Sequence, residues 1–125
     1  MTPDLPDPIG KPEVTGLQLL AKAEAQGLQE ELVRQLNKDM SMSGVEASIE
    51  EGLEAEEIVS RLKNILKELI RDDFQGYLNL LYRVDVPQSR MVASPETDFT
   101  QYVERSTYEL LKREWQKVWI RNKIQ

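Results

Sequence analysis

The sequence has 125 residues, of which 40% are apolar and 30% charged, with a formal net charge of −6; this is ordinary for one globular domain and too apolar for disorder along the whole chain. It contains neither cysteine nor histidine, which excludes disulfides, thiol nucleophiles, serine-histidine-aspartate triads and nearly all zinc sites. Because no apolar run approaches the roughly 20 residues that cross a bilayer, and no secretion signal is present at the N-terminus, we expect a cytoplasmic protein without a membrane partner.

Four prolines and two glycines in residues 1–16 predict a flexible Pro-rich arm over residues 1–15. Residues 15–18 have the form of a capping box and predict a first helix from about residue 16 to 39. Gly27 falls in the middle of this helix, where glycine costs about 1 kcal/mol relative to alanine. We expect a close contact with another helix to explain it, and a loop over residues 40–44.

A second helix is expected to begin between residues 48 and 55 and to run to residue 72. Its apolar side chains share one sector of the helix: Ile58, Leu62, Ile65, Leu66, Leu69 and Ile70. An unbroken helix would turn Phe74, Leu78 and Leu81 away from that sector, which predicts a bend or a break at residues 71–73, with Asp72 or Asp73 as the new N-cap. The third helix, at about residues 73–84, is apolar nearly all round and is expected to be the most enclosed element.

The third helix is followed by Arg83-Val84-Asp85-Val86-Pro87. One hypothesis is that Arg83 and Asp85 recognise a polar group. The simpler interpretation is a helix stop, in which Arg83 meets the negative end of the helix dipole and Pro87 cannot extend the helix. We therefore expect a structural role for this stretch.

A fourth helix is expected to begin at residues 94–96 or at residues 98–101 and to end near residue 122. It has two apolar stripes. The first is Phe99, Val103, Ser106 and Leu110, and the second is Tyr108, Leu111, Trp115, Val118 and Trp119. The sequence thus predicts an all-α domain, a bundle of about four helices over residues 16–125.

The second stripe is the candidate interface, because a simple bundle would leave it facing outward and tryptophan, tyrosine and arginine are favoured at the centres of interfaces. It consists of Tyr108, Leu111, Trp115, Val118 and Trp119. Its occupant would be a partner helix or a second copy of the chain. The alternative is that both stripes are buried within one bundle.

The spacing of Glu50, Glu51 and Glu54 would gather three carboxylates on one side of a helix, as Mg²⁺ requires. This cluster resembles the first metal motif of the all-helical nucleoside-triphosphate pyrophosphohydrolases. In that family a Glu-x-x-Asp motif follows on the next helix; Glu68 and Asp72 are the nearest approximation, but their spacing is Glu-x-x-x-Asp. The resemblance implies a Mg²⁺-dependent hydrolase of a phosphate compound. The alternative is an acidic first helical turn that complements the helix dipole.

Nucleic-acid binding is a further hypothesis, because cations accompany the aromatic residues of the last helix. The candidate residues are Arg105, Lys112, Arg113, Lys117 and Arg121. Interleaved glutamates and a pI near 4.8 argue against nucleic acid. Residues 1–60 hold 13 acidic and 4 basic side chains, and residues 61–125 hold 9 acidic and 12 basic. In one compact domain, this asymmetry favours two halves that face each other.

The stretch "LLYRVDVP", which follows a Leu- and Ile-rich helix and an acidic turn, resembles a segment of small bacterial helical proteins of unknown function. The resemblance covers roughly residues 60–87 and implies only a bacterial cytoplasmic setting. Since no catalytic constellation is present, we expect a non-enzymatic domain without a cofactor. It would act through protein-protein contacts with a partner or through self-association.

Overall fold

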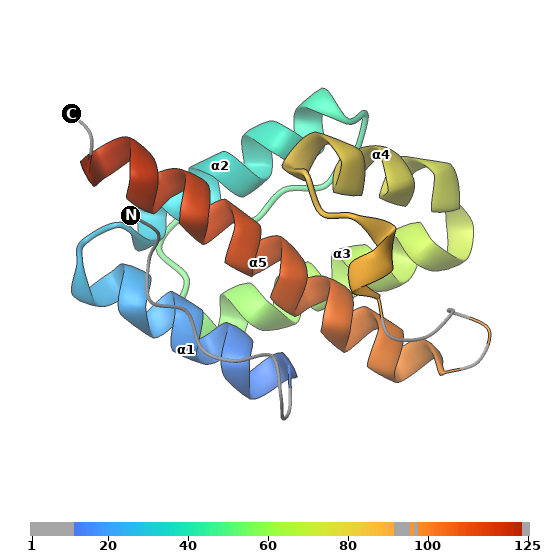
Figure 1. Ribbon diagram of the computed structural model, residues 1–125, viewed down its shortest axis with the longest axis horizontal. Coiled ribbons are helices and arrows are strands. Elements are labelled where there is room, and N and C mark those ends of the chain that lie inside the picture. Colours follow the sequence, from blue (N-terminus) through green and yellow to red (C-terminus); the bar gives the residue numbers. More distant parts are fainter. Residues whose placement is uncertain (1–11, 92–95, 97, 124–125) are drawn as a thin grey trace.

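The computed structural model describes residues 12–91, 96 and 98–123, and within them it contains helices and no strand, so the protein is all-α. There are five α-helices and one short 3-10 turn among these residues, rather than the four helices expected. The last helix crosses the molecule diagonally (Figure 1) and contacts each of the other four. The elements are α1 (Pro12–Ala25), α2 (Gln29–Met42), α3 (Ala55–Asp72), α4 (Phe74–Val84), the 3-10 turn η1 (Gln88–Arg90) and α5 (Phe99–Lys123).

The single first helix predicted from the sequence is two helices that meet at Gly27. Gly27 has a φ of 70°, a left-handed conformation that ends α1. The Gly27 N–H donates to the Glu24 carbonyl (2.9 Å) and the Leu28 N–H to the Ala23 carbonyl (2.8 Å), which is the Schellman pattern of a helix end. A Cβ at Gly27 would have no neighbour within 4 Å, so the expected close helix contact is wrong. Backbone conformation, not packing, explains this glycine.

Gly27→Ala is expected to lower the free energy of unfolding by about 1 kcal/mol, because a Cβ disfavours the left-handed conformation. The open space around Gly27 removes steric contact as a second cause. Chemical denaturation of the variant beside Gln26→Ala, an exposed neighbour with no such conformation, measures the effect. Equal stability of the two variants would contradict the assignment.

The beginning and end of these first two helices also differ from the prediction. α1 begins at Pro12, four residues before the expected start, and residues 1–11 of the expected arm lie outside the described residues. α2 continues to Met42, through most of the expected loop; Ser43 is its C-cap, and Gly44, with a φ of 82°, follows. The capping box expected at residues 15–18 is therefore inside α1.

The segment between α2 and α3 has no regular structure but is held firmly by one side chain. Asn37 donates from Nδ2 to the Ile49 carbonyl (2.9 Å) and accepts from the Ile49 N–H at Oδ1 (2.8 Å), while the Ile49 side chain is buried. After this segment, α3 begins at Ala55, and the Glu57 side chain accepts a hydrogen bond from the Glu54 N–H (3.1 Å). This start lies within the range of residues 48–55 predicted from the sequence.

The break between α3 and α4 is confirmed. Asp73 is the N-cap of α4, and its carboxylate accepts from the Gly76 N–H (3.0 Å). α4 ends at Asp85, which has a φ of 77°, and the Val86 N–H donates to the Leu81 carbonyl (2.8 Å). The Val86 side chain is buried after this turn. The stretch of residues 83–87 is thus a helix end, as expected.

The most enclosed element is α5, not α4 as expected. α4 exposes Tyr82 almost fully, at 88% of its surface. α5 begins with Asp98 as its cap, whose carboxylate accepts from the Gln101 N–H (3.0 Å); residues 94 and 95 of the other expected start lie outside the described residues. Both apolar stripes of α5 face neighbouring helices because the other four helices surround it. None of the described helices is both long and apolar enough to span a membrane.

Candidate binding surface

A groove lies along α4 and the chain that follows it. The left-handed turn at Asp85 folds Val86 back against Leu81, and Pro87 continues in an extended conformation. The space enclosed between this segment and the exposed side of α4 is about 380 Å³. We call it the uncharged groove; its lining residues are Gln75, Leu78, Asn79, Leu81, Tyr82, Val86, Pro87 and Gln88.

No charged side chain lines the uncharged groove, although 30% of the residues in the chain are charged. Tyr82 at its edge is 88% exposed, and Phe74, at the start of the same helix, is 37% exposed. The amide groups of Gln75 and Asn79 hydrogen-bond to each other (3.0 Å). Centres of protein interfaces are depleted of charge and enriched in tyrosine and phenylalanine, so the composition of this surface is that of a contact surface.

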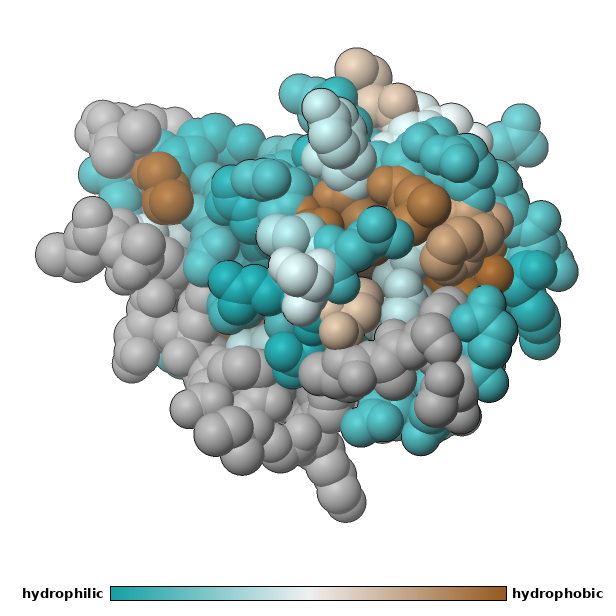
Figure 2. All heavy atoms as spheres, turned by 45° about the vertical axis from the view of Figure 1, so that its right-hand side comes forward, coloured by the Kyte–Doolittle hydropathy of each residue, from teal (hydrophilic) through white to brown (hydrophobic). Residues whose placement is uncertain are grey.

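Figure 2 brings forward the side of the molecule on which α4 begins in Figure 1. Apolar side chains gather in the middle of this face, and hydrophilic residues border them. Contiguous apolar surface with a polar border is characteristic of binding sites on soluble proteins.

A second groove, of about 270 Å³, adjoins the first and shares Val86 and Pro87 with it. We call it the basic groove; it is lined by Asp85, Val86, Pro87, Arg90, Glu109, Lys112, Arg113 and Gln116. Its cations come from η1 and from α5, and its two acidic residues are already paired. Asp85 is 3.4 Å from Nη2 of Arg113, and Glu109 is 3.4 Å from Nη2 of Arg105.

A network of charged side chains lies buried where α2, α4 and α5 meet. The Asp39 carboxylate, 3% exposed, is 3.2 Å from Nε of Arg83 and 3.2 Å from Nζ of Lys117. Glu114, fully buried, is 3.4 Å from the same Lys117 nitrogen. Buried carboxylates are retained in folded proteins only when they are paired or protonated. The side-chain amide of Gln35 also donates a hydrogen bond to the Asp39 carboxylate (3.1 Å).

The two carboxyl groups of this network have opposite pKa shifts. Burial, followed by the neighbouring Asp39, raises the pKa of Glu114 to about 8, and Lys117 opposes this with a smaller effect. Burial alone would raise the pKa of Asp39, but hydrogen bonding by Glu114 and Gln35 and the charge of Lys117 hold it below its ordinary value. Because the raised pKa of Glu114 lies above 7 and that of Asp39 is lowered, Glu114 is the protonated member at neutral pH and Asp39 is the anion.

Ion pairs join the acidic first half of the chain to its basic second half. Beyond the pairs of Asp39, Nη2 of Arg121 in α5 is 2.6 Å from the Glu31 carboxylate in α2, and Asn122 donates to the same carboxylate (3.0 Å). The hydrogen bond from Arg121 is the main cause that lowers the pKa of Glu31. Acidic side chains of residues 1–60 thus pair with basic side chains of residues 61–125 within the domain, as expected.

The candidate interface on α5 is not exposed. Four of its five residues are at most 1% exposed and the last, Trp119, is partly buried against the core: Tyr108, Leu111, Trp115, Val118 and Trp119. The expectation that this stripe faces outward is therefore corrected, and the alternative of two buried stripes describes the single chain. The physical reason is the central position of α5, which has neighbours on both apolar sides.

Four of the five candidate nucleic-acid residues are paired within the chain. Arg105 binds Glu109, Arg113 binds Asp85, Lys117 binds Asp39 and Glu114, and Arg121 binds Glu31. Lys112 lies over the Tyr108 ring, with Nζ 5.8 Å from its centre. These cations are spread over several sides of α5 and do not form one basic strip for a phosphate backbone.

The candidate metal ligands Glu50, Glu51, Glu54, Glu68 and Asp72 do not come together. Glu50 is 3.8 Å from Arg61 and Glu51 is 2.9 Å from Arg34, whereas Asp72 is at the far end of α3. Across the described residues, no group of three acidic side chains could hold a metal ion. Gly52, with a φ of 83°, explains the separation, because the cluster forms a turn instead of a helix.

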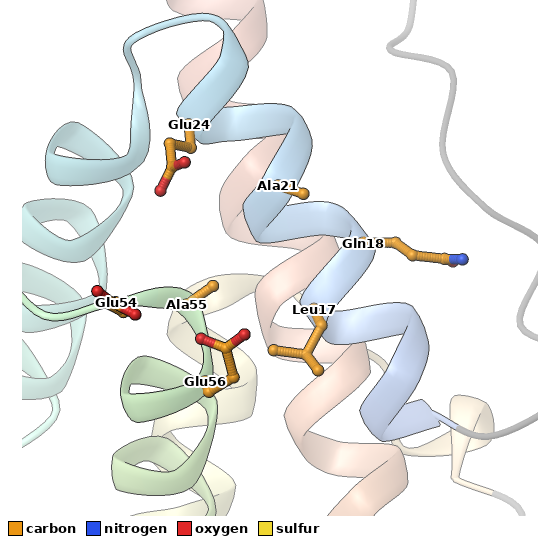
Figure 3. Close-up of a pocket in the computed structure, with 7 residues that line it drawn as sticks. All are labelled: Leu17, Gln18, Ala21, Glu24, Glu54, Ala55 and Glu56. Carbon is orange, nitrogen blue, oxygen red and sulfur yellow. The ribbon is translucent and has the colours of Figure 1, made fainter.

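Glu54 instead borders a groove of about 560 Å³ between α1 and the start of α3. Figure 3 shows Leu17 and Ala55 along this groove, with the carboxylates of Glu24, Glu54 and Glu56 at separate points around it. Gln18 points away from α3. Because the three carboxylates do not converge, the groove offers no arrangement for metal chemistry.

Sequence reasoning missed the buried network and the exposure of Tyr82. A signal for the network was present: Asp39 and Glu114 each fall among apolar residues on the buried side of their helices, at helical spacing from Leu36 and from Leu110 and Leu111. Comparisons with protein-family models, with curated proteins and with solved structures found no significant match.

Proposed function

We propose that the protein is a non-enzymatic interaction domain that binds an apolar segment of another protein in the uncharged groove of α4. The observation that supports this is a groove lined without a single charged side chain, with a tyrosine at its edge that is 88% exposed. An exposed tyrosine contributes large contact area at small entropic cost, and such residues often dominate binding energy.

The proposal keeps the function expected from the sequence but moves its location from α5 to α4. Phe74, Leu78 and Tyr82 are spaced by four residues along α4, and an apolar helix or extended segment can lie against such a row. The absence of cysteine and the resemblance of residues 60–87 to bacterial helical proteins support a bacterial, cytoplasmic setting.

Selection from a random peptide library displayed on phage tests the proposal. The wild-type domain is expected to enrich apolar peptides, and Tyr82→Ala should weaken their binding by roughly tenfold or more, the usual effect of losing an interface tyrosine. Fluorescence anisotropy gives the dissociation constants. Because Tyr82 is exposed, thermal melting should show an intact fold. Gln18→Ala, an exposed uncharged side chain on α1, is the matched control.

Two results would contradict the proposal: no peptide enriched above background, or enriched peptides that bind Tyr82→Ala as tightly as the wild type. Solution mass at several concentrations addresses the second copy of the chain as the occupant. A dimer that forms with rising concentration and is lost in Tyr82→Ala would assign the groove to self-association.

A further inference from the structure

The uncharged groove does not end at α4, because its last residues also belong to the basic groove. Val86 and Pro87 line both grooves, and both are fixed by the left-handed turn at Asp85. A segment bound along α4 and extended past Pro87 would therefore meet side chains of η1 and α5. The two grooves form one continuous surface with an uncharged part and a basic part.

Two of the three cations of the basic groove, Arg90 and Lys112, are not in ion pairs with described residues and can bind an anion. Neither Arg90 nor Lys112 forms an ion pair with any residue that the structure describes, and Arg90 is exposed. Arg105 donates to the Arg90 carbonyl (3.0 Å), which holds the backbone of η1 beside α5. Arg113 is bound only to Asp85, whose side chain is 77% exposed, and exposed ion pairs of this kind are weak. Three cations and two carboxylates thus line the basic groove; Asp85 pairs with Arg113 and Glu109 with Arg105, which leaves the charges of Arg90 and Lys112 uncompensated within it.

We propose that the partner segment is apolar at one end and acidic at the other, with its apolar residues in the uncharged groove and its carboxylates beside Arg90, Lys112 and Arg113. This inference rests on the proposed function and adds the chemistry of the partner. Charged side chains at the edge of an interface contribute mainly to specificity and to the association rate. The basic groove therefore selects which apolar segments bind.

An acidic peptide fits these grooves better than a nucleic acid. Tight binding of nucleic acid needs many phosphate contacts along a basic strip, whereas this groove has three cations in a chain with a net charge of −6. The adjoining uncharged groove also offers no cation for a continuing phosphate backbone. A peptide with a few carboxylates after an apolar run matches both parts.

The test is the same phage selection with a charge-reversed domain, Arg90→Glu with Lys112→Glu. The wild type is expected to enrich peptides with aspartate or glutamate at one end of an apolar run, and their affinity should fall as salt increases. The charge-reversed domain should bind these peptides roughly tenfold more weakly, mainly through slower association, and should enrich lysine and arginine instead. Lys38→Glu with Arg71→Glu makes the same charge change at two other exposed side chains and should leave the preference unchanged.

The outcomes separate this inference from the proposed function. Peptides that depend on Tyr82 but show no acidic preference would overturn the inference and leave the proposed function standing. Peptides that do not depend on Tyr82 would overturn both. A single-stranded oligothymidylate that displaces the selected peptides, with an affinity that depends on Arg90 and Lys112, would overturn the assignment to an acidic peptide in favour of nucleic acid.

Discussion

Trp115→Ala is expected to lower the free energy of unfolding by about 3 to 5 kcal/mol, the usual cost of removing a large aromatic side chain from a core. Trp115 is 1% exposed, and it belongs to α5, the helix that contacts the other four. The cavity left behind cannot be filled without moving these helices. Urea denaturation followed by far-ultraviolet circular dichroism measures the loss.

Trp119→Ala is the matched comparison for this result. It removes the same side chain one helical turn later, where the ring is only partly buried and Lys123 lies over it with Nζ 5.5 Å from the ring centre. We expect a clearly smaller loss of stability. A Trp115→Ala protein as stable as the wild type that no longer binds its partner would contradict the burial and restore the interface on α5.

Glu114→Gln is expected to remove a decline in stability that the wild-type protein shows as the pH rises from about 5 to about 8. The pKa of Glu114 is raised from its ordinary 4.5 to about 8 in the folded state. Between pH 4.5 and pH 8 the folded protein holds a proton on Glu114 that the unfolded chain has lost. The contribution of this proton to the free energy of unfolding is complete below pH 4.5, and it is lost as the pH rises through 8. The decline is roughly 1 kcal/mol per pH unit.

The measurement is the free energy of unfolding of both proteins at several pH values, with Glu68→Gln on the exposed side of α3 as the control. The difference between Glu114→Gln and the wild type should grow from pH 5 to pH 8 and then stay constant. Asp39 acts in the opposite window: its lowered pKa contributes stability that is lost only in acid, below its ordinary value of 3.8. Parallel curves for the Glu114→Gln and wild-type proteins would show that Glu114 is not the protonated group.

Local sequence signals predicted the helical class, the break at Asp73 and the stop at residues 83–87, because each depends on a few neighbouring residues. A capping aspartate and a proline that cannot extend a helix are visible in the sequence of such a stretch, whereas the left-handed conformation of Asp85 is not. At Gly27, local sequence could not distinguish a helix interior from a helix end. The same glycine is compatible with a helix interior that packs closely and with a helix end, and only the direction of the following helix decides between them.

The two stripes of α5 did not show whether this helix is central or carries an interface on one side. One stripe faces the core of any bundle, so the second could be an interface or a second buried side. The second stripe is buried because α1 and α3 pack against α5, and Gly16 of α1 lies close to Leu111 of that stripe. Likewise, the exposure of Tyr82 depends on which side of α4 the other helices cover, and the sequence of α4 is apolar on nearly every side.

The position of α5 has a consequence for the order of folding. The contacts of α5 span the longest stretches of sequence: Arg121 reaches Glu31 across 90 residues and Lys117 reaches Asp39 across 78, whereas Arg83 of α4 reaches Asp39 across 44. During synthesis, the first four helices emerge before α5, with their apolar sides uncovered and with an excess of acidic side chains over residues 12–84. Contacts distant in sequence form late and slow folding. We therefore expect the core to close late in folding, when α5 packs against the other four helices.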